Sequence, residues 1–143
     1  MKYYITLADG TRVPAEGGGF IARNEDITAA KVLTEVDSGK IFTLKAAAGA
    51  AITLPALEKG LVFEFIVGLA FATTDWTIVS STSVIQGGAL VAGGFIPAAD
   101  ENTISFVSTI EEIGDRVRLV CDGVNWYVEG NAKTTVALTF TDV

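Results

Sequence analysis

Short runs of β-branched and aromatic residues, separated by glycine, aspartate, asparagine and serine, recur along the chain. This pattern is typical of β-strands joined by turns, and no amphipathic helix of useful length stands out. The turns follow one another about every eight to twelve residues, a spacing found in β-sandwiches and barrels. We therefore predict an all-β fold, an antiparallel β-sandwich or a jelly-roll-like barrel. Its strands are expected at residues 3–7, 11–13, 31–36, 40–44, 51–54, 61–67, 76–80, 84–86, 103–108, 116–121, 125–129 and 135–141.

The dipeptide Asp122-Gly123 predicts a hairpin near the C-terminus, because Asp-Gly is a strong signal for a two-residue turn. That turn would place Cys121 opposite Val124. A four-residue loop would shift the pairing by two positions but leave every side chain on the same face. In either register, Cys121 and Trp126 point into the protein.

Residues 61–67 are apolar on both faces apart from Glu64, which favours a strand in the centre of a sandwich. The alanine-rich stretch 46–51 is interrupted by Gly49 and soon followed by Pro55. We therefore interpret that stretch as a turn leading into a strand.

Residues 1–26 are predicted to form an N-terminal arm, a small hairpin around Asp9-Gly10 followed by a glycine-rich linker, and residues 27–143 the sandwich domain. An isolated two-stranded hairpin is marginally stable, so the apolar residues of the arm need the main domain or a partner to pack on. The segment 87–97 is also unusually apolar for a loop. The candidate contacts with other protein are therefore Tyr3, Tyr4, Ile5, Leu90, Val91, Phe95 and Ile96.

The size and charge of the chain limit its possible partners. A chain of 143 residues suits one core. The formal net charge of −7, with ten basic residues, argues against binding to nucleic acid or to an anionic membrane. The start of the chain does not resemble a signal peptide, and a single cysteine excludes an internal disulfide. Synthesis in a reducing cytosol is expected.

The absence of histidine removes the usual catalytic triads and most catalytic zinc sites. The remaining candidates are the carboxylates Glu111, Glu112, Asp115, Asp100 and Glu101, which are the residue types of glycosidase and calcium sites. Their spacing fits neither chemistry well, and we interpret them as solvated loop residues. We therefore expect no catalytic residues, no metal and no cofactor.

Three further side chains have both a structural and a functional interpretation. Cys121 has no basic neighbour in sequence and is interpreted as a core thiol. The two tryptophans, together with the tyrosines, could form a platform that stacks on sugars, as in a lectin or a receptor-binding tip. Trp126 is expected in the core, whereas the pattern around Trp76 leaves both interpretations open.

From about Ile27 to its end, the chain resembles capsid decoration proteins of tailed phages, and the related β-rich domains of head or tail fibres. The resemblance lies in the order of segments 37–44 (DSGKIFTL), 52–55 (ITLP), 60–67 (GLVFEFIV), 76–79 (WTIV), 85–88 (IQGG), 114–117 (GDRV) and 121–130 (CDGVNWYVEG).

This resemblance implies a non-enzymatic virion protein, made in the bacterial cytoplasm and displayed on the capsid surface. It would form a homotrimer seated at local three-fold positions of the major capsid protein, and the candidate contacts given above would then meet a sister subunit or the capsid. The alternative is a fibre or adaptor protein that recognises a glycan or another feature of the host.

Overall fold

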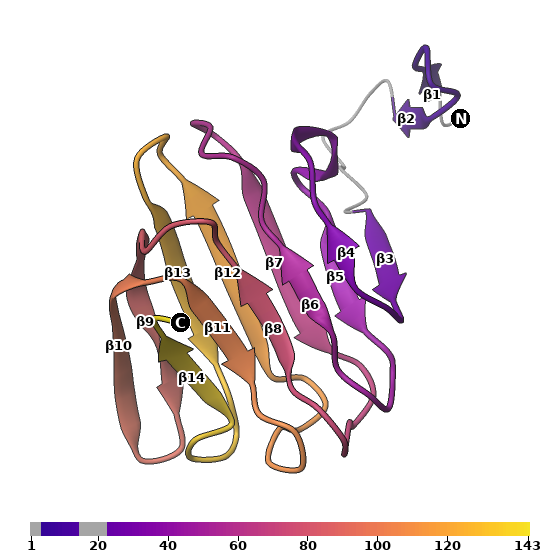
Figure 1. Cartoon of the computed structure of the whole chain (residues 1–143). Coiled ribbons are helices and arrows are strands. Elements are labelled where there is room, and N and C mark those ends of the chain that lie inside the picture. The colour runs from indigo at the N-terminus through magenta and orange to yellow at the C-terminus, as the bar shows by residue number, and fades with distance from the viewer. Residues whose placement is uncertain (1–3, 15–22) are drawn as a thin grey trace.

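The computed structural model describes residues 4–14 and 23–143. The expected all-β sandwich is confirmed: two mixed sheets pack face to face, and a separate two-stranded hairpin precedes them in the chain (Figure 1). The single short helix of the described residues is the 3₁₀ turn η1 (Glu35–Asp37). It lies where the sequence predicted a continuous strand over residues 31–36.

One sheet has seven strands and the other five. The seven-stranded sheet follows the order β10 (Gly94–Glu101), β9 (Ile85–Val91), β13 (Trp126–Asn131), β12 (Arg116–Cys121), β7 (Val62–Val67), β5 (Ile41–Leu44) and β3 (Asn24–Ile27). The five-stranded sheet follows the order β14 (Leu138–Thr141), β11 (Thr103–Phe106), β8 (Trp76–Val79), β6 (Ala51–Thr53) and β4 (Lys31–Val32).

The expectation of antiparallel pairing is corrected for the first half of the sandwich. From β3 to β8 the chain alternates between the two sheets, so that β3, β5 and β7 are parallel neighbours in one sheet. In the same way β4, β6 and β8 are parallel in the other. Parallel pairing follows because the chain crosses to the other sheet and back between two neighbouring strands, and so enters the same sheet again in the same direction. The expectation is corrected for one later pair too, since β9 and β13 are parallel. The pairs β7–β12, β12–β13 and β8–β11 are antiparallel, as expected.

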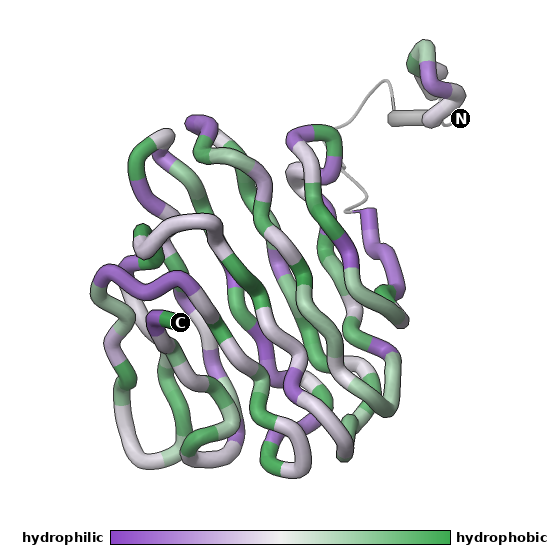
Figure 2. Tube along the Cα trace, in the orientation of Figure 1, coloured by the Kyte–Doolittle hydropathy of each residue, from purple (hydrophilic) through white to green (hydrophobic). Residues whose placement is uncertain are grey.

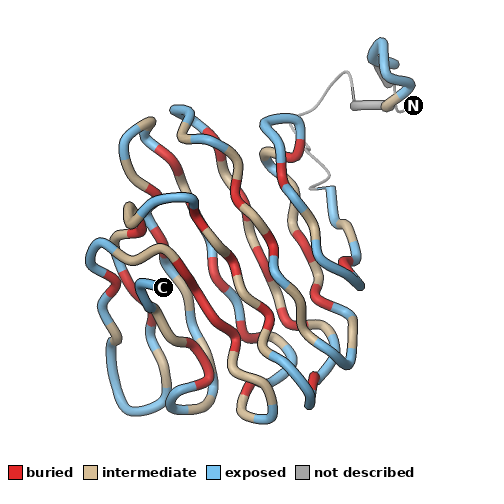
Figure 3. The backbone as a smooth tube through the Cα atoms, in the orientation of Figure 1, coloured by how far each residue is buried: buried red, intermediate tan, exposed pale blue. Residues whose placement is uncertain are grey.

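The core lies between the sheets and is made by the inward half of each strand. In β7, Phe63, Phe65 and Val67 are buried while the residues between them are half-exposed, so the predicted central strand is confirmed. The same alternation is visible along the central strands in Figure 3. Phe42 of β5 stacks on Phe65 with 5.4 Å between the ring centroids.

The hairpin of β12 and β13 has a four-residue loop and not the two-residue turn suggested by Asp122-Gly123. Cys121 therefore pairs with Trp126 and not with Val124. The reason is the Asp122 carboxylate, whose Oδ1 accepts the backbone N–H groups of Val124 and Asn125, both at 2.8 Å. Because the shift is two positions, the predicted faces are retained.

Two strands were not expected from the sequence. β3 consists of Asn-Glu-Asp-Ile, and its first residues lie within the segment 1–26 predicted as arm. Figure 2 shows this edge strand as largely hydrophilic. β10 and most of β9 occupy the segment predicted as an apolar loop, so residues 87–97 form a hairpin with its turn at Ala92 and Gly93.

The N-terminal hairpin pairs β1 (Tyr4–Thr6) with β2 (Arg12–Pro14) in antiparallel register. Its turn follows the Asp9-Gly10 signal. The Asp9 carboxylate accepts the backbone N–H of Thr11 at 2.9 Å, and Gly10 adopts a φ of 83°. Neither strand of this hairpin pairs with a strand of the sandwich.

Candidate functional site

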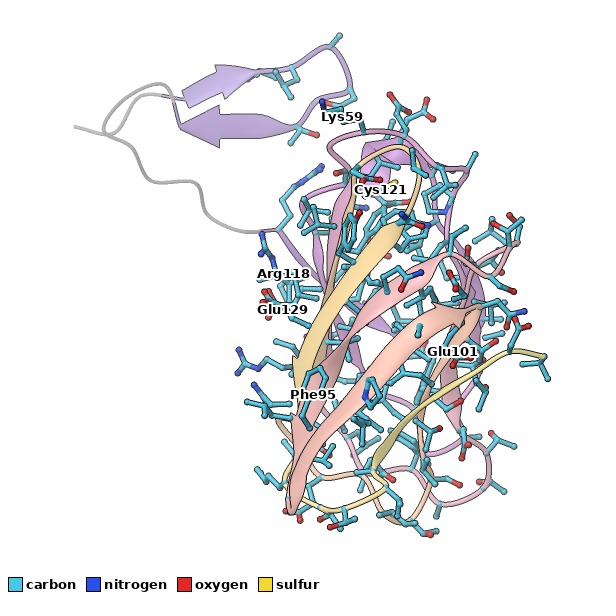
Figure 4. All side chains as sticks on the ribbon, turned by 90° about the vertical axis from the view of Figure 1, so that its left-hand side faces the viewer. Lys59, Phe95, Glu101, Arg118, Cys121 and Glu129 are labelled. Atoms are coloured by element: carbon cyan, nitrogen blue, oxygen red, sulfur yellow. The ribbon has the colours of Figure 1, made fainter. Side chains whose placement is uncertain are left out.

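A groove of about 570 Å³ lies on the outer face of the seven-stranded sheet. It crosses five adjacent strands, from β7 through β12, β13 and β9 to β10. Figure 4 shows Arg118 and Glu129 projecting together from this face, away from the five-stranded sheet. The outward side chains that line it are Glu64, Leu90, Phe95, Arg116, Arg118, Glu129 and Asn131.

Gly88 forms the floor of the groove. It pairs with Glu129 on one side and with Pro97 on the other, so a side chain here would point outward between them. A Cβ atom at this position would lie 2.4 Å from Cζ of Phe95 and 2.3 Å from the carbonyl oxygen of Ile96. The phenyl ring of Phe95 therefore lies directly against the Gly88 backbone.

The apolar wall of the groove is formed by Leu90 and Phe95, which are paired across β9 and β10. These two residues are 62% and 60% exposed. Val91 and Ile96, which were grouped with them as candidate contacts, point the other way and pack partly buried against the core. The structure thus separates these four predicted contacts into two exposed and two internal residues.

The three remaining candidate contacts belong to the arm. Tyr3 lies outside the described residues. Tyr4 and Ile5 are in β1, where they pair with Pro14 and Val13, and their side chains lie outside the described part of the structure.

The polar wall of the groove carries two cations and two carboxylates. Glu64, Arg118 and Glu129 occupy directly paired positions on β7, β12 and β13. An Arg118 nitrogen lies 3.4 Å from a Glu129 oxygen, and an Arg116 nitrogen lies 3.7 Å from a Glu64 oxygen. The side chains of both arginines are about half exposed.

These four groups use little of their capacity for hydrogen bonding. A guanidinium has five N–H donors and a carboxylate two acceptor oxygens. Within the described part of the chain, the long contact from Arg118 to Glu129 is the one hydrogen bond that their side chains make. The amide of Asn131 also lines the groove. The groove therefore presents free donors beside free acceptors, next to an exposed aromatic ring.

The interpretation of the acidic residues as solvated loop residues is corrected for Glu111 and Asp115, which are buried because their carboxylates accept backbone N–H groups. Asp100 and Glu101 lie in β10 and not in a loop. Asp115 is fully buried, and its two oxygens accept the backbone N–H groups of Lys133 at 3.0 Å and Glu112 at 2.8 Å. Glu111 accepts the backbone N–H of Phe71 at 2.8 Å. Asp100 accepts a hydrogen bond from Gln86. Across residues 4–14 and 23–143, no cluster of acidic, histidine or cysteine side chains could hold a metal ion.

The thiol and both tryptophans are buried. Cys121 is 2% exposed, as predicted, and Gly123 donates its backbone N–H to the sulfur at 3.4 Å. Trp126 is confirmed in the core, and Trp76, which the sequence left open, is also fully buried. Neither indole is available to stack on a ligand. The exposed ring of the groove is Phe95.

A second charged cluster, which we call the edge cluster, was not recognised in the sequence. It consists of Glu25, Lys31, Asp37 and Lys40, at the side of the sandwich where β3 and β4 are the last strands of their sheets. Lys31 of β4 pairs with Glu25 of β3, and so joins the two sheets. The Lys31 ammonium also lies 5.3 Å from the ring centroid of Phe42.

Lys40 completes the edge cluster, with its ammonium 2.9 Å from Glu25 and 2.6 Å from Asp37. Hydrogen bonds from Lys31 and then Lys40 lower the pKa of Glu25. Burial opposes ionisation of Asp37, but hydrogen bonds from Lys40 and the Thr34 backbone outweigh it, so the pKa of Asp37 is also lowered. The hydrogen bond to Asp37 raises the pKa of Lys40.

No helix of the described residues is long and apolar enough to span a bilayer. A comparison of the chain with protein-family models, with curated proteins and with solved structures finds no match.

Proposed function

We propose that the chain is a structural protein of a phage virion, a capsid decoration protein that binds the outer surface of the head and stabilises it. It would act as a homotrimer on the major capsid protein. The observation that supports this best is the ordered series of segments that resemble such proteins over most of the chain. Those segments lie in strands of one sandwich, β5 to β9, β12 and β13.

The proposal includes no catalytic step. The chain has no histidine, and in the loop 111–115 the carboxylates of Glu111 and Asp115 accept backbone N–H groups. Function would then consist of binding. A protein that binds only the assembled shell stabilises it by mass action, and many modest contacts add up over a particle.

We assign shell attachment to the N-terminal arm. Its hairpin is too small to be stable without a partner, and its strands pair with neither sheet of the sandwich. The arm carries Tyr3, Tyr4 and Ile5, three of the contacts expected from the sequence. Tyrosine in particular is enriched at the centre of protein interfaces.

The test combines light scattering with sedimentation of bare phage heads. The full chain should have the mass of a trimer and should pellet with the heads. Removing residues 1–19 should leave the thermal unfolding midpoint of the sandwich nearly unchanged and should weaken pelleting. A monomer that stays in the supernatant would contradict the proposal. A truncated protein that unfolds would show that the arm belongs to the sandwich.

A fibre or adaptor protein that recognises a glycan is the second candidate function. The observation in its favour is the groove, which places an exposed aromatic ring beside exposed guanidinium and carboxylate groups. Glycan binding without any binding to heads would favour this candidate over decoration.

A further inference from the structure

We propose that the groove on the seven-stranded sheet binds a neutral oligosaccharide. This inference goes beyond attachment to a capsid and rests on the groove alone, so it applies whether or not the protein binds heads. It also names the ligand class for the second candidate function.

The first argument is the aromatic platform. The tip of the Phe95 ring lies against the backbone of Gly88, with Cζ and Cε2 as the nearest ring atoms, and the residue remains 60% exposed. An aromatic face is apolar and carries partial negative charge, so it attracts the polarised C–H groups on one face of a sugar ring. Leu90 extends the same apolar surface along β9.

The second argument is the balance of charge. An anionic ligand in the groove would approach Glu64 and Glu129, and a cationic ligand would approach Arg116 and Arg118. A purely apolar ligand would cover four charged groups without giving them hydrogen bonds, which is costly. A ligand without net charge that is rich in polar groups avoids all three penalties.

The third argument is hydrogen-bonding capacity. A sugar hydroxyl is both a donor and an acceptor, so one hydroxyl can donate to a carboxylate and accept from a guanidinium. Glu129 and Arg118 lie side by side on paired strands, with 3.4 Å between a guanidinium nitrogen and a carboxylate oxygen. One hydroxyl, or two neighbouring hydroxyls, of a sugar can therefore contact both groups. Asn131 adds both kinds of group at the same surface.

The size of the groove limits the ligand. A volume of about 570 Å³ is within the usual range of small-molecule sites. It accommodates a short oligosaccharide. Because the groove is an open surface of a sheet, we expect a dissociation constant on the order of 1 mM.

This inference assigns Leu90 and Phe95, which the sequence predicted as contacts with other protein, to a ligand. Shell attachment through the arm would then leave the groove free to face outward. A decorated head would display one such groove for every copy of the chain.

The experiment is NMR titration of the ¹⁵N-labelled full chain. The probes are chitotriose, cellotriose, maltotriose and mannotriose, with 3′-sialyllactose as the anionic comparison, each up to about 10 mM. We expect at least one neutral trisaccharide to shift the amide resonances of Gly88, Leu90 and Glu129. Phe95→Ala and Arg118→Gln should each weaken that binding at least about tenfold. Ile113→Ala, which removes an equally exposed apolar side chain outside the groove, should have no effect.

The unperturbed part of each spectrum shows that a variant is folded. The inference is overturned if no neutral probe shifts groove resonances, if 3′-sialyllactose binds more tightly than all of them, or if Phe95→Ala binds as tightly as the wild type. Loss of head pelleting in Phe95→Ala, with no sugar binding by the wild type, would assign the groove to a protein contact. Absence of sugar binding with head pelleting intact in Phe95→Ala would overturn this inference alone and leave the proposed function standing.

Discussion

At the scale of single residues, Glu111 shows how a buried carboxylate holds two loops together. It is 6% exposed, and one oxygen accepts the backbone N–H of Phe71, forty positions earlier in the chain. The other oxygen is buried and has no partner among the described residues. The oxygen that accepts the N–H of Phe71 therefore stabilises the contact, whereas no hydrogen-bond donor compensates the burial of the other oxygen.

We expect Glu111→Ala to destabilise the protein by about 1–3 kcal/mol, because it leaves the N–H of Phe71 buried without an acceptor. Glu111→Gln keeps an acceptor for that N–H, so it should lose less stability than Glu111→Ala. Urea denaturation of both variants measures the difference. Equal losses in the two variants would show that the charge, and not the acceptor, holds the loop.

Gly88 offers a test of the contact beneath Phe95. Gly88→Ala introduces a Cβ within 2.4 Å of the ring and 2.3 Å of a carbonyl oxygen, so β9 and β10 must separate or the ring must tilt. Gly94→Ala is the matched control, since Gly94 has a similar φ of 145° but no atom near its missing Cβ. We expect Gly88→Ala to cost about 1–3 kcal/mol more than the control in urea denaturation. Equal costs would show that backbone strain alone is responsible.

The sequence predicted the inward residues better than the outward ones. Alternation along a strand was enough to place Cys121 and Trp126 in the core. The groove could not be predicted, because its side chains come from β7 and from the two hairpins β9–β10 and β12–β13, three segments that are distant in sequence and become neighbours through the sheet order. A glycine in a strand signals a close approach, but the sequence does not say that a phenyl ring makes it.

At the scale of elements, the edge cluster closes the side of the sandwich where two sheet edges meet. Glu25 pairs with Phe42 in the sheet register, so its carboxylate points toward the gap between the sheets and not away from them. Charged residues that point inward at an edge discourage pairing with another chain. Here they also join β3 to β4 through Lys31.

The edge cluster should make stability depend on pH at both extremes. Glu25 and Asp37 have ordinary pKa values of 4.5 and 3.8, and both are lowered by folding. Their contribution is therefore present above those values and is lost as the pH falls through the lower folded values. Lys40 has its pKa raised above 10.5, so its contribution is present below 10.5 and is lost at higher pH.

We expect stability to fall less steeply in Glu25→Gln than in the wild type as the pH is lowered below 4.5, because the variant has one carboxylate fewer to protonate. Unfolding free energies measured across this range for the wild type and the variant give the comparison. Glu58→Gln, at an exposed turn, is the control and should follow the wild type. A variant profile parallel to the wild type would show that the ion pairs of Glu25 do not contribute.

The parallel pairing of β3 to β8 was the main feature of element arrangement that the sequence did not predict. Turn signals identify where strands end, but they do not show whether the next strand joins the same sheet or crosses to the other. Asp122-Gly123 marked a true hairpin, although its loop length depended on hydrogen bonds to a side chain. The hairpin of β9 and β10 was missed because its glycines resembled a loop.

At the scale of the whole molecule, the formal charge of −7 opposes the proposed trimer. Three copies bring like charges together, and dissolved salt screens that repulsion. We expect the trimer to strengthen when sodium chloride is raised from about 20 to about 300 mM. Analytical ultracentrifugation measures the association constant at each concentration. Weaker association at high salt would show that the subunits are held together by complementary ion pairs.

The alternation of the chain between the sheets also has a consequence for the order of folding. None of the strands from β3 to β8 can form a ladder with its immediate successor, so this region has no local nucleus and must close long loops. The hairpin of β12 and β13 is local, and it is also the template against which β7 pairs. The C-terminal half should therefore form first and the N-terminal half should wind onto it. In a φ-value analysis, Leu119→Ala should slow folding, whereas Ile52→Val should mainly accelerate unfolding.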